Sequence, residues 1–90
     1  MNILKKADEI VNERAEEKER QYGPFAECNK KAATIASVLC GKVITTKDIY
    51  NFQIALKLAR ESYSHKQDNL LDAVAYIGAL NNFLNPFDNE

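Results

Sequence analysis

Helix-breaking residues occur at only a few places in this sequence, and their positions are the feature that most restricts its fold. They are Gly23-Pro24, Gly41, the polar stretch SYSHKQ at 62–67, and Pro86. Between these breaks, apolar residues recur at steps of three and four, which is the period of one face of an α-helix. The sequence therefore predicts an all-α antiparallel bundle of about four helices joined by short loops.

Local signals give approximate helix boundaries within a single domain that spans residues 1–90. Pro24 suits the first turn of a helix, and Gly41 suits a C-terminal cap. Thr45 and Asp48 match a capping box, in which side chains satisfy the free amides of the first turn. The predicted helices run over about residues 2–22, 24–40, 46–63 and 67–84, followed by a frayed tail at 86–90.

The apolar stripe of each helix predicts the face that it buries. In the second helix the stripe is Phe25, Cys28, Ala32, Ile35, Ala36 and Leu39. In the third helix it is Ile49, Phe52, Leu56, Ala59 and Tyr63. In the fourth helix it is Leu70, Val74, Ile77, Gly78 and Leu84, and we expect close helix approach at the glycine.

Composition excludes several classes of function. The formal net charge is -1, and no basic helix or finger motif is present, so we expect no direct contact with nucleic acid. No apolar run approaches 18 residues, and the first residues lack the apolar block of a signal peptide, so we expect a cytoplasmic protein without a membrane span. Cys28 and Cys40 lack the spacing of a zinc site and are expected to face the core.

The segment KLARESYSHKQDNLLDAVAY, residues 57–76, gathers cations and acids around the third break. Because the connection is short, the helices on its two sides are antiparallel, and Lys57 or Arg60 can meet Asp72. An Asp among apolar neighbours requires a partner. This pattern is compatible with an ion-pair network that joins two helices, and equally with a polar pocket open to an anionic or metal-bound ligand. His65, the sole histidine, is expected to be exposed in the connector.

The same residues resemble a family of small phage and prophage proteins. Its pattern is roughly R-x-x-x-Y-G, then K-x-x-R, then K-x-D-N-x-x-D-x-x-G-Y, against ERQYG, KLAR and KQDNLLDAVAY here, with Ala75 in place of the last Gly. The resemblance extends from about Ile3 to Leu84. More distantly, the chain looks like nucleotide-modification-associated proteins and MazG-like nucleoside triphosphate pyrophosphohydrolases. In the latter, four acids hold Mg²⁺, but Lys57 and Arg60 stand here where acids are expected.

The resemblance implies a protein that binds a nucleotide or a related phosphorylated small molecule, encoded by a phage or prophage and acting in the cytoplasm of a bacterial host. The residues expected to contact the ligand are Lys57, Arg60, Lys66, Asn69, Tyr22 and Tyr76. The residues expected to hold Mg²⁺, or to pair with those cations, are Glu61, Asp68 and Asp72. No catalytic residue can be assigned, and pyrophosphohydrolase activity is at most an extension of this binding function.

Two further expectations concern partners. The alternative to nucleotide binding is a non-enzymatic interaction protein that binds a host factor, in an anti-defence or regulatory role. The third and fourth helices also carry apolar residues off their main stripes, at Ile54, Leu58, Leu71 and Phe83. A helix that is apolar on most of its circumference is normally buried all round, so we predict a homodimer or higher oligomer built on these two helices.

Overall fold

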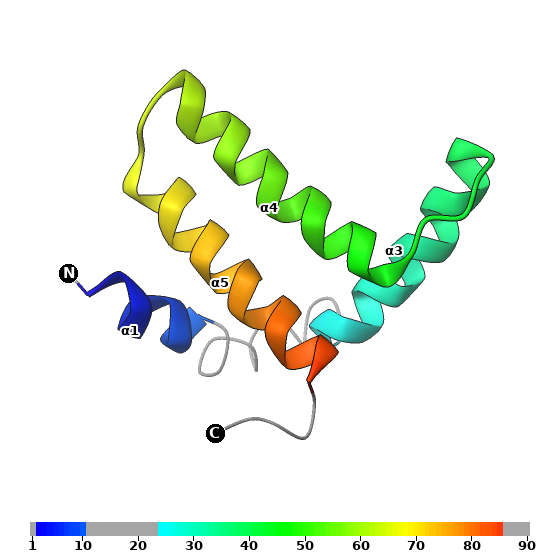
Figure 1. Ribbon diagram of the computed structural model, residues 1–90, viewed down its shortest axis with the longest axis horizontal. Helices are drawn as coiled ribbons and strands as arrows, with labels where there is room; N and C mark the ends of the chain where they lie inside the picture. The colour runs from blue at the N-terminus through cyan, green and yellow to red at the C-terminus, as the bar shows by residue number, and fades with distance from the viewer. Residues whose placement is uncertain (1, 11–23, 86–90) are drawn as a thin grey trace.

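The computed structural model describes residues 2–10 and 24–85, and this part of the chain contains helices and no strand. The helices are α1 (Ile3–Asp8), α3 (Phe25–Cys40), α4 (Thr46–Tyr63) and α5 (Gln67–Leu84) (Figure 1). The predicted all-α class is confirmed, and α3, α4 and α5 begin and end within about one residue of the predicted boundaries. The predicted first helix is observed over Ile3–Asp8, while its later part, with Tyr22, and the predicted frayed tail lie outside the described residues.

Capping interactions explain where the helices begin and end. Thr45 and Asp48 form the predicted capping box, in which the Asp48 amide donates to Thr45 Oγ1 at 3.1 Å and the Thr45 amide donates to Asp48 Oδ2 at 2.9 Å. Gly41 ends α3 with a φ of 69°, a left-handed conformation that favours glycine. Asn2 caps α1 by accepting from the amides of Leu4 and Lys5.

The arrangement of the helices is built around an α4–α5 hairpin. The two helices run antiparallel, α1 packs against α5, and α3 packs against α4 and projects away from the pair (Figure 1). One core cluster joins α1 to α5 through Ala7, Leu71 and Ala75. No helix in the described ranges is long and apolar enough to cross a membrane.

A second packing centre is aromatic and joins α3, α4 and α5. Phe25 packs edge-on against Tyr50, with ring centroids 5.6 Å apart, and stacks on Tyr76 at 6.0 Å. Tyr50 also packs against Phe83 at 5.2 Å. Tyr50 is almost completely buried, and burial raises the pKa of its hydroxyl, while the neighbouring Asn29 side chain acts in the opposite direction.

The prediction of which face of α3 is buried is wrong, because the helix is rotated about its axis relative to the prediction. The face that packs on α4 contains Asn29 and Ala33, whereas Ile35 and Leu39 are exposed. Cys28 and Cys40 are exposed as well, which corrects their predicted core positions. Small and polar side chains allow α3 to approach α4 closely, and the larger apolar side chains consequently face outward.

The stripes of α4 and α5 differ from the prediction in the same way. On α4, Tyr50 is buried while Phe52, Leu56 and Tyr63 are exposed. On α5, the buried residues are Asn69, Leu71, Ala73 and Ala75, because this helix is covered by α4 on one side and by α1 on another. The expected close approach at Gly78 is also wrong, since a Cβ atom built there would meet no atom within 4 Å.

Candidate functional site: the closed end of the α4–α5 hairpin

The turn between α4 and α5 is organised by Glu61, which lies in the last turn of α4. Its carboxylate accepts the backbone N–H of Lys66 at 3.0 Å and the side-chain amide of Asn69 at 3.5 Å, and it contacts His65 Nδ1. These interactions join the end of α4, the connector and the first turn of α5. One acidic side chain therefore determines how the chain reverses direction at this end of the hairpin.

Glu61 is held in its ionised form by its neighbours. The hydrogen bond with His65 has the largest effect in lowering the pKa of Glu61 below its ordinary value of 4.5, and the Lys66 amide adds to this lowering. His65 itself is exposed, as predicted for a residue of the connector. Since the Glu61 carboxylate already has three protein partners, it acts here as a support for the turn.

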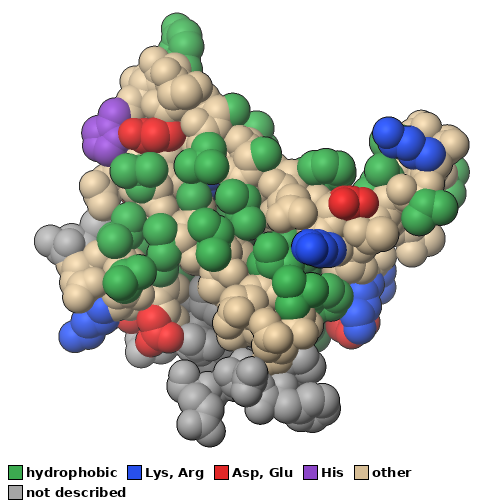
Figure 2. Space-filling model, viewed as in Figure 1, with side chains coloured by type: hydrophobic (Ala, Val, Ile, Leu, Met, Phe, Trp, Pro, Cys, Tyr) green, Lys and Arg blue, Asp and Glu red, His purple; other side chains and the backbone are tan. Residues whose placement is uncertain are grey.

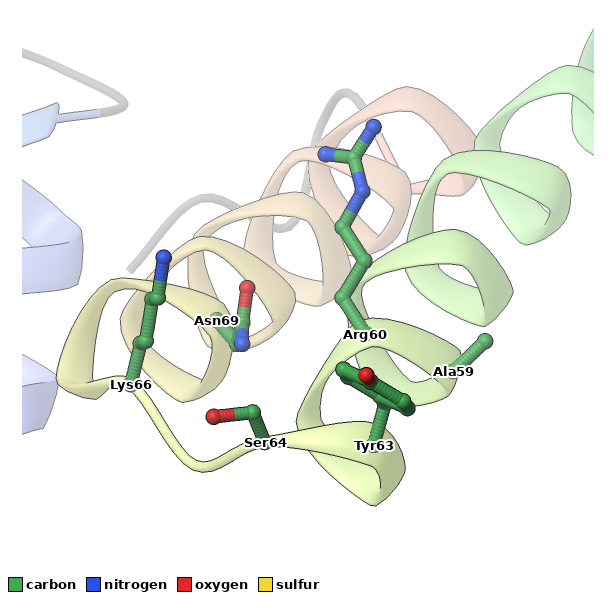
Figure 3. A pocket seen from close by; sticks show the side chains of 6 residues that line it. All are labelled: Ala59, Arg60, Tyr63, Ser64, Lys66 and Asn69. Atoms are coloured by element: carbon green, nitrogen blue, oxygen red, sulfur yellow. The ribbon is translucent and has the colours of Figure 1, made fainter.

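Beside this turn the surface is hollowed. The open hollow has a volume of about 570 Å³ and is lined by residues of α4, the connector and α5: Ala59, Arg60, Tyr63, Ser64, Lys66 and Asn69. In Figure 3, the side chains of Arg60 and Lys66 extend on either side of Asn69. The structure thus brings together three of the predicted ligand-contacting residues.

The groups around the hollow are available to a ligand. Among the described residues, neither Arg60 nor Lys66 has an acidic side chain within ion-pair distance. Tyr63 is 94% exposed, so its ring presents a free aromatic face. Asn69 is buried, and the bond that its amide donates to Glu61 fixes its orientation. Two cations, a hydroxyl, an amide and an aromatic ring therefore surround one open volume.

The predicted ion pair between the two helices is confirmed, and it lies outside this hollow. Lys57 Nζ is 2.9 Å from Asp72 Oδ2, and both side chains are mostly buried. Tyr76 is occupied by its stacking on Phe25. Lys57 and Tyr76 therefore stabilise helix packing instead of lining the hollow, and Tyr22 lies outside the described part of the chain.

The three acids predicted to hold a metal are not brought together. Glu61 supports the turn, Asp72 pairs with Lys57, and Asp68 is exposed in the first turn of α5. Within the described ranges, no group of three or more His, Cys, Asp or Glu side chains is placed to hold a metal ion. Magnesium binding by these acids stays a prediction from the sequence.

Sequence reasoning missed a buried polar pair between α3 and α4. Asn29 is 2% exposed and accepts a hydrogen bond from Gln53 Nε2 at 3.3 Å. Among the residues that the structure describes, Asn29 Nδ2 and Gln53 Oε1 are buried and have no hydrogen-bond partner. The signal in the sequence is the spacing of four that places Asn29 between Phe25 and Ala33, although hydrophobicity alone assigns a polar residue to the exposed face.

The fold and the hollow define a small all-α protein whose longest described helices form a hairpin with a basic, open site at its closed end. A family model covering residues 2–84 matches the chain, which therefore belongs to the DUF6378 family, described as a domain of unknown function. No curated protein and no solved structure matches the chain.

Proposed function

We propose that the hollow at the closed end of the α4–α5 hairpin binds a phosphate-bearing small molecule of the nucleotide class. The observation that carries this proposal is the pair of cations, Arg60 and Lys66, which border the same open volume without an acidic partner among the described residues. A protein with a net charge of -1 has no general attraction for anions, so two cations beside the same hollow are the feature that favours binding of an anion here.

Four of the residues that line the hollow have distinct roles in this proposal. Arg60 offers a planar fork that binds two phosphate oxygens, and Lys66 offers a point charge that neutralises a further oxygen. The Ser64 hydroxyl is a hydrogen-bond donor on the same rim. Tyr63 provides a face on which a base can stack, which distinguishes a nucleotide from a bare phosphate.

The proposal is confined to binding because the carboxylates at this site are already engaged. Glu61 and Asp72 have protein partners, and the third predicted acid, Asp68, is exposed in the first turn of α5, next in sequence to the lining residue Asn69. Mg²⁺ commonly binds through one or two carboxylates together with substrate phosphates. The phage origin, the cytoplasmic location and the MazG-like pyrophosphohydrolase activity stay predictions from the sequence.

Calorimetric titration tests the proposal directly. Nucleoside mono-, di- and triphosphates are titrated into the full chain with and without Mg²⁺, beside inorganic tripolyphosphate, which has the charge but no base. We expect saturable binding that becomes tighter with the number of phosphates. Absence of heat across the whole panel, at concentrations up to the millimolar range typical of weak ligands, would overturn the proposal.

Matched variants locate the binding. Arg60→Met and Lys66→Met keep the apolar stem and remove the charge, and each is expected to weaken nucleotide binding about tenfold or more. Lys31→Met, on the exposed surface of α3, is the control and should leave affinity unchanged. Tyr63→Ala should weaken nucleotides but not tripolyphosphate. Equal affinities in the Arg60, Lys66 and Lys31 variants would place the ligand elsewhere.

A further inference from the structure

The outward faces of α3 and α4 carry an unusual number of large apolar side chains. Val38, Leu39 and Val43 are 78%, 80% and 84% exposed, and Phe52 and Leu56 on α4 are each more than half exposed. We call these residues, together with Ile35, the outer apolar surface. The lining of the hollow contains none of them, although Phe52 and Leu56 lie on the same stripe of α4 as the lining residues Ala59 and Tyr63.

The position of α3 explains why this surface is uncovered. The helix packs against α4 through its inner face, and its C-terminal end forms an arm that projects away from the hairpin (Figure 1). Figure 2 shows hydrophobic side chains along this arm. Ser37 fixes the connector on the inner side, because its hydroxyl accepts the Ile44 amide at 2.8 Å, so that Ile44 is buried while Val43 faces outward.

The composition of the arm is that of a buried segment. Residues 32–41 contain no charged side chain, although most of them belong to a helix with an exposed face. The inner face of α3 holds Asn29, Ala33 and Ser37, whereas the largest apolar residues of the arm, Ile35, Val38 and Leu39, are exposed. A helix normally buries its most apolar face, so the outward face of α3 has the character of a second packing surface.

The chain as a whole exposes more surface than a compact monomer of its mass. The accessible surface of the chain is 6597 Å². A compact folded monomer of 10.2 kDa is expected to expose about 5,300 Å². This excess of about 1,300 Å² belongs to the chain as a whole, and for comparison a standard stable interface buries roughly 800 Å² per partner. Contiguous apolar patches above a few hundred Å² on a monomer commonly mark such interfaces.

We propose that the outer apolar surface is a self-association surface, on which a second copy of this chain packs across a two-fold axis. A second copy supplies an equally apolar and uncharged face, and a net charge of -1 opposes association only weakly. This places the interface on α3 and α4. It differs from the predicted interface on the third and fourth helices, because Leu71 is in the core and Phe83 packs on Tyr50.

Light scattering coupled to gel filtration tests the proposal on the full chain. At about 100 μM protein we expect a mass twice 10.2 kDa. Leu39→Glu and Leu56→Glu each place a charge in the interface and should give the mass of one chain, with unchanged helical circular dichroism. Leu4→Glu is the control, since Leu4 is 68% exposed on α1, away from this surface, and it should remain dimeric.

Three results would overturn the proposal: a wild-type mass of one chain, a dimer that persists in either of the two interface variants, or a dimer that is lost equally in the Leu4→Glu control. Nucleotide binding does not enter these measurements. Arg60→Met, which lies in the hollow, should keep the wild-type mass, so the two proposals can fail independently.

Discussion

The Lys57–Asp72 ion pair offers the sharpest test of how α4 and α5 are held together. The two charged atoms are 2.9 Å apart, and the side chains are 19% and 31% exposed. At an effective dielectric constant of about 20, such a separation corresponds to roughly 5–6 kcal/mol of attraction before desolvation is subtracted. Exposed pairs contribute about 0–1 kcal/mol, while breaking a fully buried pair costs about 3–5 kcal/mol. The Lys57–Asp72 pair is neither fully exposed nor fully buried, so we expect its contribution to stability to lie between these two ranges.

We therefore expect Asp72→Ala to lower the free energy of unfolding by about 2 kcal/mol, because Lys57 is left mostly buried without its partner. For a chain of this size the loss corresponds to a melting temperature lower by about 8–16 °C. Asp72→Asn keeps the shape and one acceptor oxygen, so its loss should be smaller. The assay is urea and thermal unfolding followed by circular dichroism, at one protein concentration because association shifts apparent stability.

A second ion pair in the same chain is the matched control. Lys30 and Glu27 are 3.2 Å apart on the surface of α3, with side chains 54% and 59% exposed. Lys30→Met should change stability by no more than about 0.5 kcal/mol. The double variant Lys57→Met/Asp72→Ala should lose less than the sum of its single variants. Strict additivity, or an unchanged melting temperature in both Asp72 variants, would refute the reasoning.

Two further predictions concern α5 and the turn. Gly78→Ala should raise the free energy of unfolding by about 0.5–1 kcal/mol in urea titrations, because the new methyl group meets no atom within 4 Å; a loss of stability would show that the helix approach predicted from the sequence is real. The lowered pKa of Glu61 means that its contribution to stability is present above its ordinary value of 4.5 and is lost as the pH falls through the lower folded value. Glu61→Gln should therefore make the acid loss of stability shallower, and urea midpoints that fall with pH as steeply as in the wild type would contradict this.

The sequence predicted those features that depend on local chemistry. Gly41 predicts where α3 ends, and the Thr45–Asp48 capping box predicts where α4 begins. Both signals act over only three or four residues. The Lys57–Asp72 pair follows from the short connection, which makes its two helices antiparallel and brings positions at similar distances from the turn together.

The sequence did not predict which way the helices face. Hydrophobicity alone favoured the largest apolar residues, such as Ile35 and Phe52, for the core, whereas the structure packs α3 through Asn29 and Ala33. Small side chains permit a close approach that no single-helix pattern reveals. The role of Glu61 was missed for a related reason: its partners Lys66 and Asn69 come close only when the turn has formed.

The most direct test of the proposed function is to map where a nucleotide contacts the protein. Two-dimensional nuclear magnetic resonance spectra of the ¹⁵N-labelled chain, recorded during titration with a nucleoside triphosphate, report on each backbone amide. The account predicts that the largest shifts occur from Ala59 to Asn69, around Arg60 and Lys66, and that they disappear in the Arg60→Met/Lys66→Met variant. Shifts centred on α1 or α3, or spectra that do not change at saturating nucleotide, would contradict it.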